Sequence, residues 1–103
     1  MTKVMKIAEL QNTLLFSDND AWRDDAAEDL ARLYWHEPQA QQILLDAIMS
    51  GYLDESLIHT AAESLAEIWN KLGKVNMDIY RQLSGVSKYV ADAFIEQAKI
   101  PIE

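Results

Sequence analysis

The sequence predicts an all-α domain of about six helices, arranged as three stacked antiparallel hairpins. An internal repeat supports this fold: the segment 54–72 matches the segment 20–35, and Ala61-Ala62-Glu63 falls on Ala26-Ala27-Glu28, 35 residues earlier. Glycine and proline are scarce, with three and two residues among 103, which disfavours turn-rich β architecture. No segment shows a competing strand pattern, so every element is expected to be a helix.

Two helices are expected before residue 38. The first spans Lys3–Phe16, where apolar residues recur at helical spacing. The second spans Asp20–Trp35 and follows several residues whose side chains can cap a helix N-terminus, beginning at Ser17. The tripeptide His36-Glu37-Pro38 ends it.

The third helix is expected to begin at Pro38, because the N–H that proline lacks would have no helical acceptor in a first turn. Gly51 fits the left-handed conformation that stops this helix. The fourth helix opens at Asp54 or Glu55 and ends at Leu72, just before a second glycine.

Two shorter segments complete the expected set of helices. Asn76 can cap a fifth helix that runs to Leu83 and is followed by Gly85. The sixth helix spans Val86–Lys99 and ends where Pro101 prevents its continuation. All three glycines of the chain therefore lie just beyond expected helices.

The repeat lies on the second helix of each expected hairpin. The hairpins form one domain, with units at approximately 1–36, 37–73 and 74–103. A third, weaker copy places Ala91 on Ala62 and Asp92 on Glu63. Three two-helix units of about 35 residues meet the minimum that a helical solenoid needs to bury a continuous core.

The repeated helix resembles the second helix of a HEAT-type repeat. The pattern is read at Asp20, Ala26, Ala27, Leu30, Ala31 and Leu33, and again at Glu55, Ala61, Ala62, Leu65, Ala66 and Ile68. The third copy keeps little beyond Ala91 and Phe94. The resemblance implies an α-solenoid, a class of scaffold that binds proteins far more often than it catalyses reactions. Tetratricopeptide-like or simply bundled helical hairpins fit the same pattern.

The formal net charge of −8 is concentrated in one segment. Residues 18–29 hold six carboxylates against the single Arg23 and so carry −5 of that charge. A surface of this sign repels phosphate backbones and anionic lipids, and it attracts basic partners. The charge therefore indicates a basic protein as partner and argues against direct binding to nucleic acid or to a membrane.

The absence of cysteine and of long apolar runs bears on the compartment. Without cysteine, disulfides and thiolate zinc sites are excluded. The first fifteen residues lack the uninterrupted apolar core and the small-residue cleavage site of a signal peptide. No apolar run approaches the roughly 20 residues that span a bilayer. A soluble, cytoplasmic protein is expected.

The three tryptophans take different positions on the helical wheels. Trp22 and Trp69 fall inside the apolar arcs of the second and fourth helices, and both are expected in the core. Trp35 falls among acids, between Asp24 and Glu28. We expect it either to anchor a partner or to fold back beneath the third helix.

The outward residues of the copies correspond as well as the apolar ones do. Stacked units would place Glu28, Glu63 and Asp92 in one row across the domain, where they could dock a basic surface. The alternative is that these acids are only the solvated faces of amphipathic helices. The candidate partner-binding residues are Asp24, Asp25, Glu28, Trp35, His59, Glu63, Glu67 and Asp92.

Catalytic and metal-binding patterns are weak in this chain. His59 and Glu63 share a helix face, but a metal site needs three or four ligands and His36 lies in a distant loop. The chain has no glycine-rich phosphate loop, no cysteine nucleophile and no nucleophile elbow. The sequence therefore predicts no enzyme, no catalytic residue, no metal and no cofactor.

The function expected from these features is a protein-binding module that docks a basic partner, as a monomer within a heteromeric complex. In size, charge and expected fold the chain is similar in character to bacterial immunity proteins, which neutralise a cognate toxin. One alternative is an adaptor or subunit that stacks on itself or on a larger helical assembly. Another is a small enzyme or metal-binding protein.

Overall fold

The computed structural model describes residues 5–102, which form six α-helices and no strand. The helices are α1 (Ile7–Phe16), α2 (Asp20–Tyr34), α3 (Pro38–Met49), α4 (Glu55–Leu72), α5 (Met77–Tyr80) and α6 (Gly85–Ala98). None of them is long and apolar enough to cross a membrane. The prediction of an all-α fold with six helices is confirmed.

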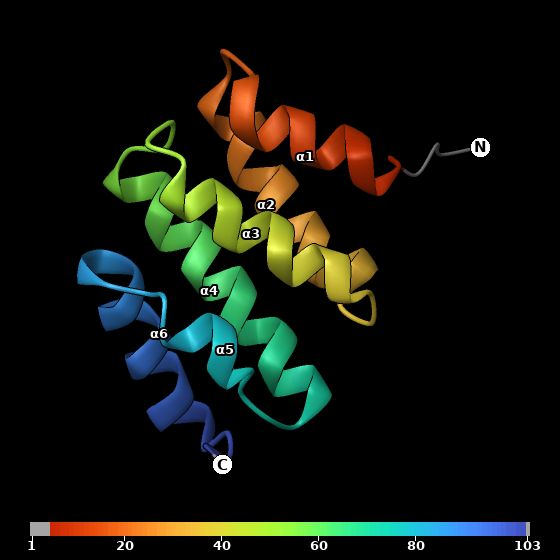
Figure 1. The fold of residues 1–103 in the computed structure, drawn as a ribbon. Helices are drawn as coiled ribbons and strands as arrows, with labels where there is room; N and C mark the ends of the chain where they lie inside the picture. The colour runs from red at the N-terminus through yellow and green to blue at the C-terminus, as the bar shows by residue number, and fades with distance from the viewer. Residues whose placement is uncertain (1–4, 103) are drawn as a thin grey trace.

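Helix α4 lies at the centre of the arrangement (Figure 1). It packs against α2 on one side and α6 on the other, so that α2, α4 and α6 follow one another across the molecule. Helix α1 packs against α2, and α3 packs against α4 while also touching α1, α2 and α5. The Cα atoms span 38 × 30 × 21 Å.

Side-chain caps hold the helix starts that the sequence predicts. The side-chain oxygen of Asn19 accepts a hydrogen bond from the N–H of Trp22 at 3.1 Å, so Asn19 is the cap among the candidates before α2. Asp54 caps α4 in the same way, accepting from the N–H of Leu57 at 2.9 Å. Gly73 ends α4 in the left-handed conformation, with φ of +84°.

The helix boundaries agree with the expected ones to within one residue, except at the start of α1 and the end of α5, and the expected role of Gly85 also differs. Helix α1 begins at Ile7, not Lys3, which lies outside the described residues. Helix α5 ends at Tyr80 instead of Leu83, because the chain turns there to reach α6. The expectation that Gly85 follows a helix is wrong, since Gly85 is the first residue of α6.

The repeated alanines lie in the core, as the repeat predicts. Ala26 and Ala27 of α2 and Ala61 and Ala62 of α4 are all at most 2% exposed. Such small side chains let neighbouring helix axes approach closely. Fully buried leucines fill the space between helices: Leu14, Leu30, Leu44 and Leu65. Burying each of these contributes about 1.5–3 kcal/mol relative to leaving it in water.

Arg23 joins three segments of backbone beside this core. Its Nε donates a hydrogen bond to the carbonyl of Leu14 at 2.9 Å, and its Nη2 donates to that of Leu15 at 3.3 Å. The same Nη2 donates to the carbonyl of Tyr52 at 2.6 Å. The last carbonyls of a helix have no partner within it, so Arg23 satisfies the end of α1 and ties it to the connection between α3 and α4.

Candidate protein-docking surface

An open groove of about 420 Å³ runs between α1 and α2. Its lining residues, which we call the Trp22 groove, are Met5, Leu10, Thr13, Trp22, Asp25, Ala26 and Asp29. Leu10 and Ala26 are buried and belong to the hydrophobic core, so the groove has an apolar floor. Two carboxylates, Asp25 and Asp29, stand along its α2 side.

Trp22 is the most unexpected residue of the groove, because the sequence predicts it in the core. That prediction is wrong: Trp22 is 63% exposed. A helical wheel gives the direction of a side chain but not the extent to which a neighbouring helix covers it. Leu10 and Thr13 of α1 and Met5, which precedes α1, share the groove, and they leave most of the indole ring open to solvent.

The two carboxylates of the groove differ in their partners. Asp29 accepts a hydrogen bond from the guanidinium of Arg32 at 2.7 Å, within the same helix. Asp25 is exposed, and no salt bridge between described residues includes it. Asp25 is therefore a negative charge beside an exposed aromatic ring with no cation of the described chain to neutralise it.

The acidic field extends from the groove along α2 to Glu28 and to Glu67 of α4. The pKa of Glu28 is raised above its ordinary value of 4.5, first by burial and then by neighbouring negative charges. Those charges belong to Asp25, Asp24, Asp29 and Glu67, in decreasing order of effect. Four acids of α2 and one of α4 therefore share one region of the surface.

Asp24 adds an unsatisfied acceptor to this region. Its Oδ1 atom is shielded from solvent and accepts no hydrogen bond from any described residue. A buried carboxylate oxygen without a partner is unfavourable. The surface of α2 near Glu28 therefore includes a carboxylate oxygen that no hydrogen-bond donor of the described residues satisfies.

The predicted row of acids forms only in part. Across the contact between α2 and α4, the acid of α4 that acts on Glu28 is Glu67, one helical turn beyond the aligned Glu63. Glu63 instead lies 3.1 Å from His59 in an exposed pair, and both line a shallow groove between α4 and α6.

Asp92 of α6 has partners of its own on α5 and α6. Asp92 does not line the groove between α4 and α6. The α6 residues that line it are Tyr89, Val90, Ala93, Phe94 and Gln97. The Asp92 carboxylate instead accepts a hydrogen bond from the Tyr80 hydroxyl at 2.6 Å and pairs with Lys88 at 3.0 Å. The Tyr80 hydrogen bond is the largest cause that holds its pKa below the ordinary value of 3.8.

Trp35 lies against the hydrophobic core and is less exposed than Trp22. Its side chain is half-buried and packs against the hydrophobic core, at the residue where α2 ends. Its ring meets the edge of the His36 ring, with 5.5 Å between their centroids. The aromatic ring that stands exposed among acids is therefore that of Trp22, at the opposite end of α2.

The described residues contain no group of three or more His, Cys, Asp or Glu side chains placed to hold a metal ion. Comparison with models of protein families, with curated proteins and with solved structures finds no match. The function therefore has to be inferred from the groove and the charges around it.

Proposed function

We propose that the protein is a non-catalytic protein-binding module that docks a basic partner at the Trp22 groove. The observation that carries this proposal is Trp22 itself, 63% exposed beside the carboxylates of Asp25 and Asp29. Tryptophan is among the residues that most often dominate binding energy at protein interfaces, where it fills a desolvated pocket. Here it would lie against an apolar patch of the partner.

The charge around the groove defines the chemistry of that partner. Residues 18–29 carry −5 of the net −8, and Glu67 of α4 adds to the same field. Such a field steers a positively charged protein toward the surface and disfavours acidic competitors. Lysine or arginine side chains of the partner would face Asp25 and Glu28, which are three residues apart and therefore neighbours on the surface of α2.

The arrangement of helices supports a HEAT-like stack of three antiparallel hairpins as the scaffold of this module. In that architecture α2, α4 and α6 form one layer, and the acids of α2 and α4 lie on its outer side. A stoichiometric role of this kind suits a small immunity protein that neutralises a basic toxin, and we include that role in the proposal.

The test begins with affinity capture from the native host, followed by purification of the captured protein and titration calorimetry. We expect a basic protein that binds one to one. Trp22→Ala should weaken this binding by about 30-fold or more, the size of effect found at interface hot spots. Asp25→Lys should weaken the binding of the partner more at low salt than at high salt, because salt screens the charges.

Tyr89→Ala is the matched control, because Tyr89 is an exposed aromatic residue (77%) on α6 that lines the groove beside His59 and Glu63. Its binding should stay within about twofold of the wild type, as expected outside a hot spot. If Tyr89→Ala weakens binding while Trp22→Ala does not, the docking surface lies between α4 and α6 instead. If light scattering shows that the isolated protein self-associates across the micromolar range, this result would favour the alternative function, an adaptor that stacks on itself.

A further inference from the structure

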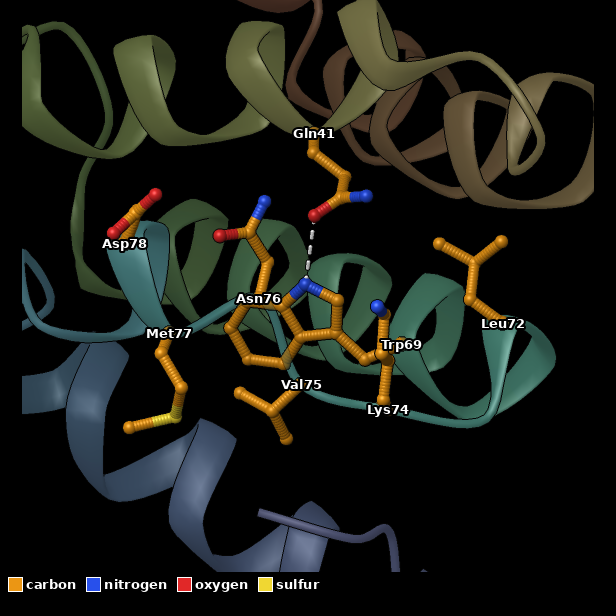
Figure 2. A pocket seen from close by; sticks show the side chains of 8 residues that line it. All are labelled: Gln41, Trp69, Leu72, Lys74, Val75, Asn76, Met77 and Asp78. Carbon is orange, nitrogen blue, oxygen red and sulfur yellow. Dashed lines mark hydrogen bonds between the residues drawn. The ribbon is translucent and has the colours of Figure 1, made fainter. Parts of the chain in front are cut away.

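A second cavity, of about 380 Å³, lies between α3, the C-terminal half of α4 and the segment that leads into α5 (Figure 2). It is separate from the Trp22 groove and shares no lining residue with it. At this size it falls at the small end of the range for pockets that bind small molecules.

Gln41 of α3 brings a buried amide to this pocket. The Nε1 of Trp69 donates a hydrogen bond to its Oε1 at 2.8 Å, and the two residues are 7% and 0% exposed. An indole N–H can only donate, so the atom that faces it must be the amide oxygen. The NH₂ group of Gln41 is thereby turned away from Trp69, as Figure 2 shows, and it donates to no described residue.

Asn76 presents a second amide by the same logic. Its Oδ1 accepts a hydrogen bond from the backbone N–H of Ile79 at 3.3 Å, where it caps α5. Because a backbone N–H fixes the oxygen, the NH₂ group of Asn76 is left for the pocket that this side chain lines. Both amides therefore offer donors, and both have their acceptors already engaged.

Lys74 supplies the positive charge of the pocket. It follows Gly73 directly, and no carboxylate among the described residues lies within ion-pair distance of it. The acid of the lining is Asp78, whose carboxylate is 95% exposed and lies 3.7 Å from Arg81. The apolar part of the wall comes from Leu72, Val75 and Met77.

We propose that this pocket binds a small carboxylate with an apolar body. A carboxylate has only acceptors, and it would take hydrogen bonds from the NH₂ groups of Gln41 and Asn76 and a charge-assisted bond from Lys74. Its body would lie against Leu72 and Met77. This binding site is independent of the docking surface proposed above.

The acids of the rest of the chain do not face the pocket. Glu67, which belongs to the acidic field of α2, is two residues from Trp69, and two residues correspond to about 200° of rotation on a helix. Glu67 and Trp69 therefore project from nearly opposite sides of α4. At physiological salt the remaining acids are screened over about 8 Å.

The test uses benzoate, which joins a carboxylate to a flat apolar ring, and follows the indole N–H of Trp69 by two-dimensional ¹H–¹⁵N NMR. We expect benzoate to shift this resonance saturably, and we expect the uncharged isostere benzamide and inorganic phosphate to leave it in place. The indole signals of Trp22 and Trp35 serve as internal controls, because neither residue lines the pocket.

Three variants change the pocket without removing its structural hydrogen bonds. Gln41→Glu and Asn76→Asp keep the acceptor oxygen and replace the NH₂ donor with a second oxygen, and Lys74→Met removes the charge at an exposed position. Each should weaken benzoate binding about tenfold or more. Lys6→Met, before α1, removes the same charge at a distance and should bind as the wild type does.

Three results would overturn the proposal. One is an indole shift as large with benzamide as with benzoate. Another is a Lys74→Met variant, folded by circular dichroism, that titrates as the wild type does. The third is the absence of any shift at the Trp69 indole up to about 20 mM benzoate, a concentration about 20-fold above a Kd of about 1 mM.

Discussion

The guanidinium of Arg23 donates a hydrogen bond of 2.6 Å to the backbone carbonyl of Tyr52, which lies 29 residues later in the chain. The same side chain is only 12% exposed and also holds the carbonyls of Leu14 and Leu15. Arg23 of α2 thus links the end of α1 to the connection between α3 and α4. The planar, multiply donating guanidinium makes this possible where an ammonium would not.

Arg23→Met should lower the free energy of unfolding by about 2–4 kcal/mol, because it keeps the apolar stem but leaves the three carbonyls without their charged donor. Arg23→Lys should recover less than half of the loss, since its ammonium cannot span three acceptors in fixed geometry. Urea unfolding followed by circular dichroism measures both.

Arg32→Met is the control. The Arg32 side chain is 66% exposed in a surface pair with Asp29, and its replacement should change stability by less than about 0.5 kcal/mol. Equal effects of the two Met variants would contradict the role assigned to Arg23.

The buried pair of Gln41 and Trp69 should be coupled in a double-mutant cycle. Gln41→Met leaves the indole N–H buried without an acceptor, which should cost about 1–3 kcal/mol of stability. Trp69→Phe removes the donor and part of a fully buried ring, and it should cost a similar amount. The double variant should be more stable than the sum of the two predicts, by about 0.5–2 kcal/mol. Simple additivity within error would mean that the 2.8 Å hydrogen bond contributes nothing to stability.

The raised pKa of Glu28 predicts that this residue destabilises the fold at neutral pH. A carboxyl group whose pKa is higher in the folded than in the unfolded protein favours unfolding once it is ionised, so the penalty is present above the folded pKa. It is relieved as the pH falls through that value. Glu28→Gln should therefore be slightly more stable than the wild type at pH 7, by less than about 0.5 kcal/mol because the site is exposed and screened. The gain should disappear near pH 4 and shrink in 0.5 M salt. A variant less stable at pH 7 would show that the acids of α2 do not repel one another.

Asp92 should show the opposite dependence on pH. The Tyr80 hydroxyl, and to a smaller degree Lys88, hold its pKa below 3.8, so it stabilises the folded protein above the unfolded pKa and loses this effect as the pH falls through the folded one. Tyr80→Phe should raise the Asp92 pKa toward 3.8, as followed by the carboxyl ¹³C shift in NMR. Its stability deficit at pH 7 should be below about 1 kcal/mol, since the Asp92 carboxylate is 42% exposed, and should narrow below pH 4. An unchanged Asp92 pKa in this variant would show that the hydrogen bond does not persist in solution.

Much of the helix layout could be predicted from sequence because its determinants are local. The caps at Asn19 and Asp54 act within three residues, and Gly73 adopts the left-handed conformation at the residue after α4. The alanine repeat also predicted a buried face correctly, since Ala26 and Ala61 occupy equivalent positions of the two copies and both are buried. The boundaries failed where tertiary context matters, as at the short α5.

The candidate site was predicted less well. Asp25, Glu28 and Glu67 lie in one acidic field, but Asp92 does not, because aligned positions in a repeat need not adjoin after the helices are packed. The burial of Gln41 could not be predicted from sequence, since the local sequence is the same whether a glutamine near the start of a helix is exposed or packed against a tryptophan. Its burial depends on Trp69, which is 28 residues away.

The sequence by itself determined that this chain is helical, where most of its helices start and stop, and that its negative charge gathers in residues 18–29. These features follow from hydrogen bonds and periodicities that act over three or four residues. Only the tertiary structure decided that Trp69 is buried while Trp22, which also falls within an apolar arc, is 63% exposed. Burial depends on which neighbouring helix covers a side chain, and that is set by the packing of segments far apart in the sequence.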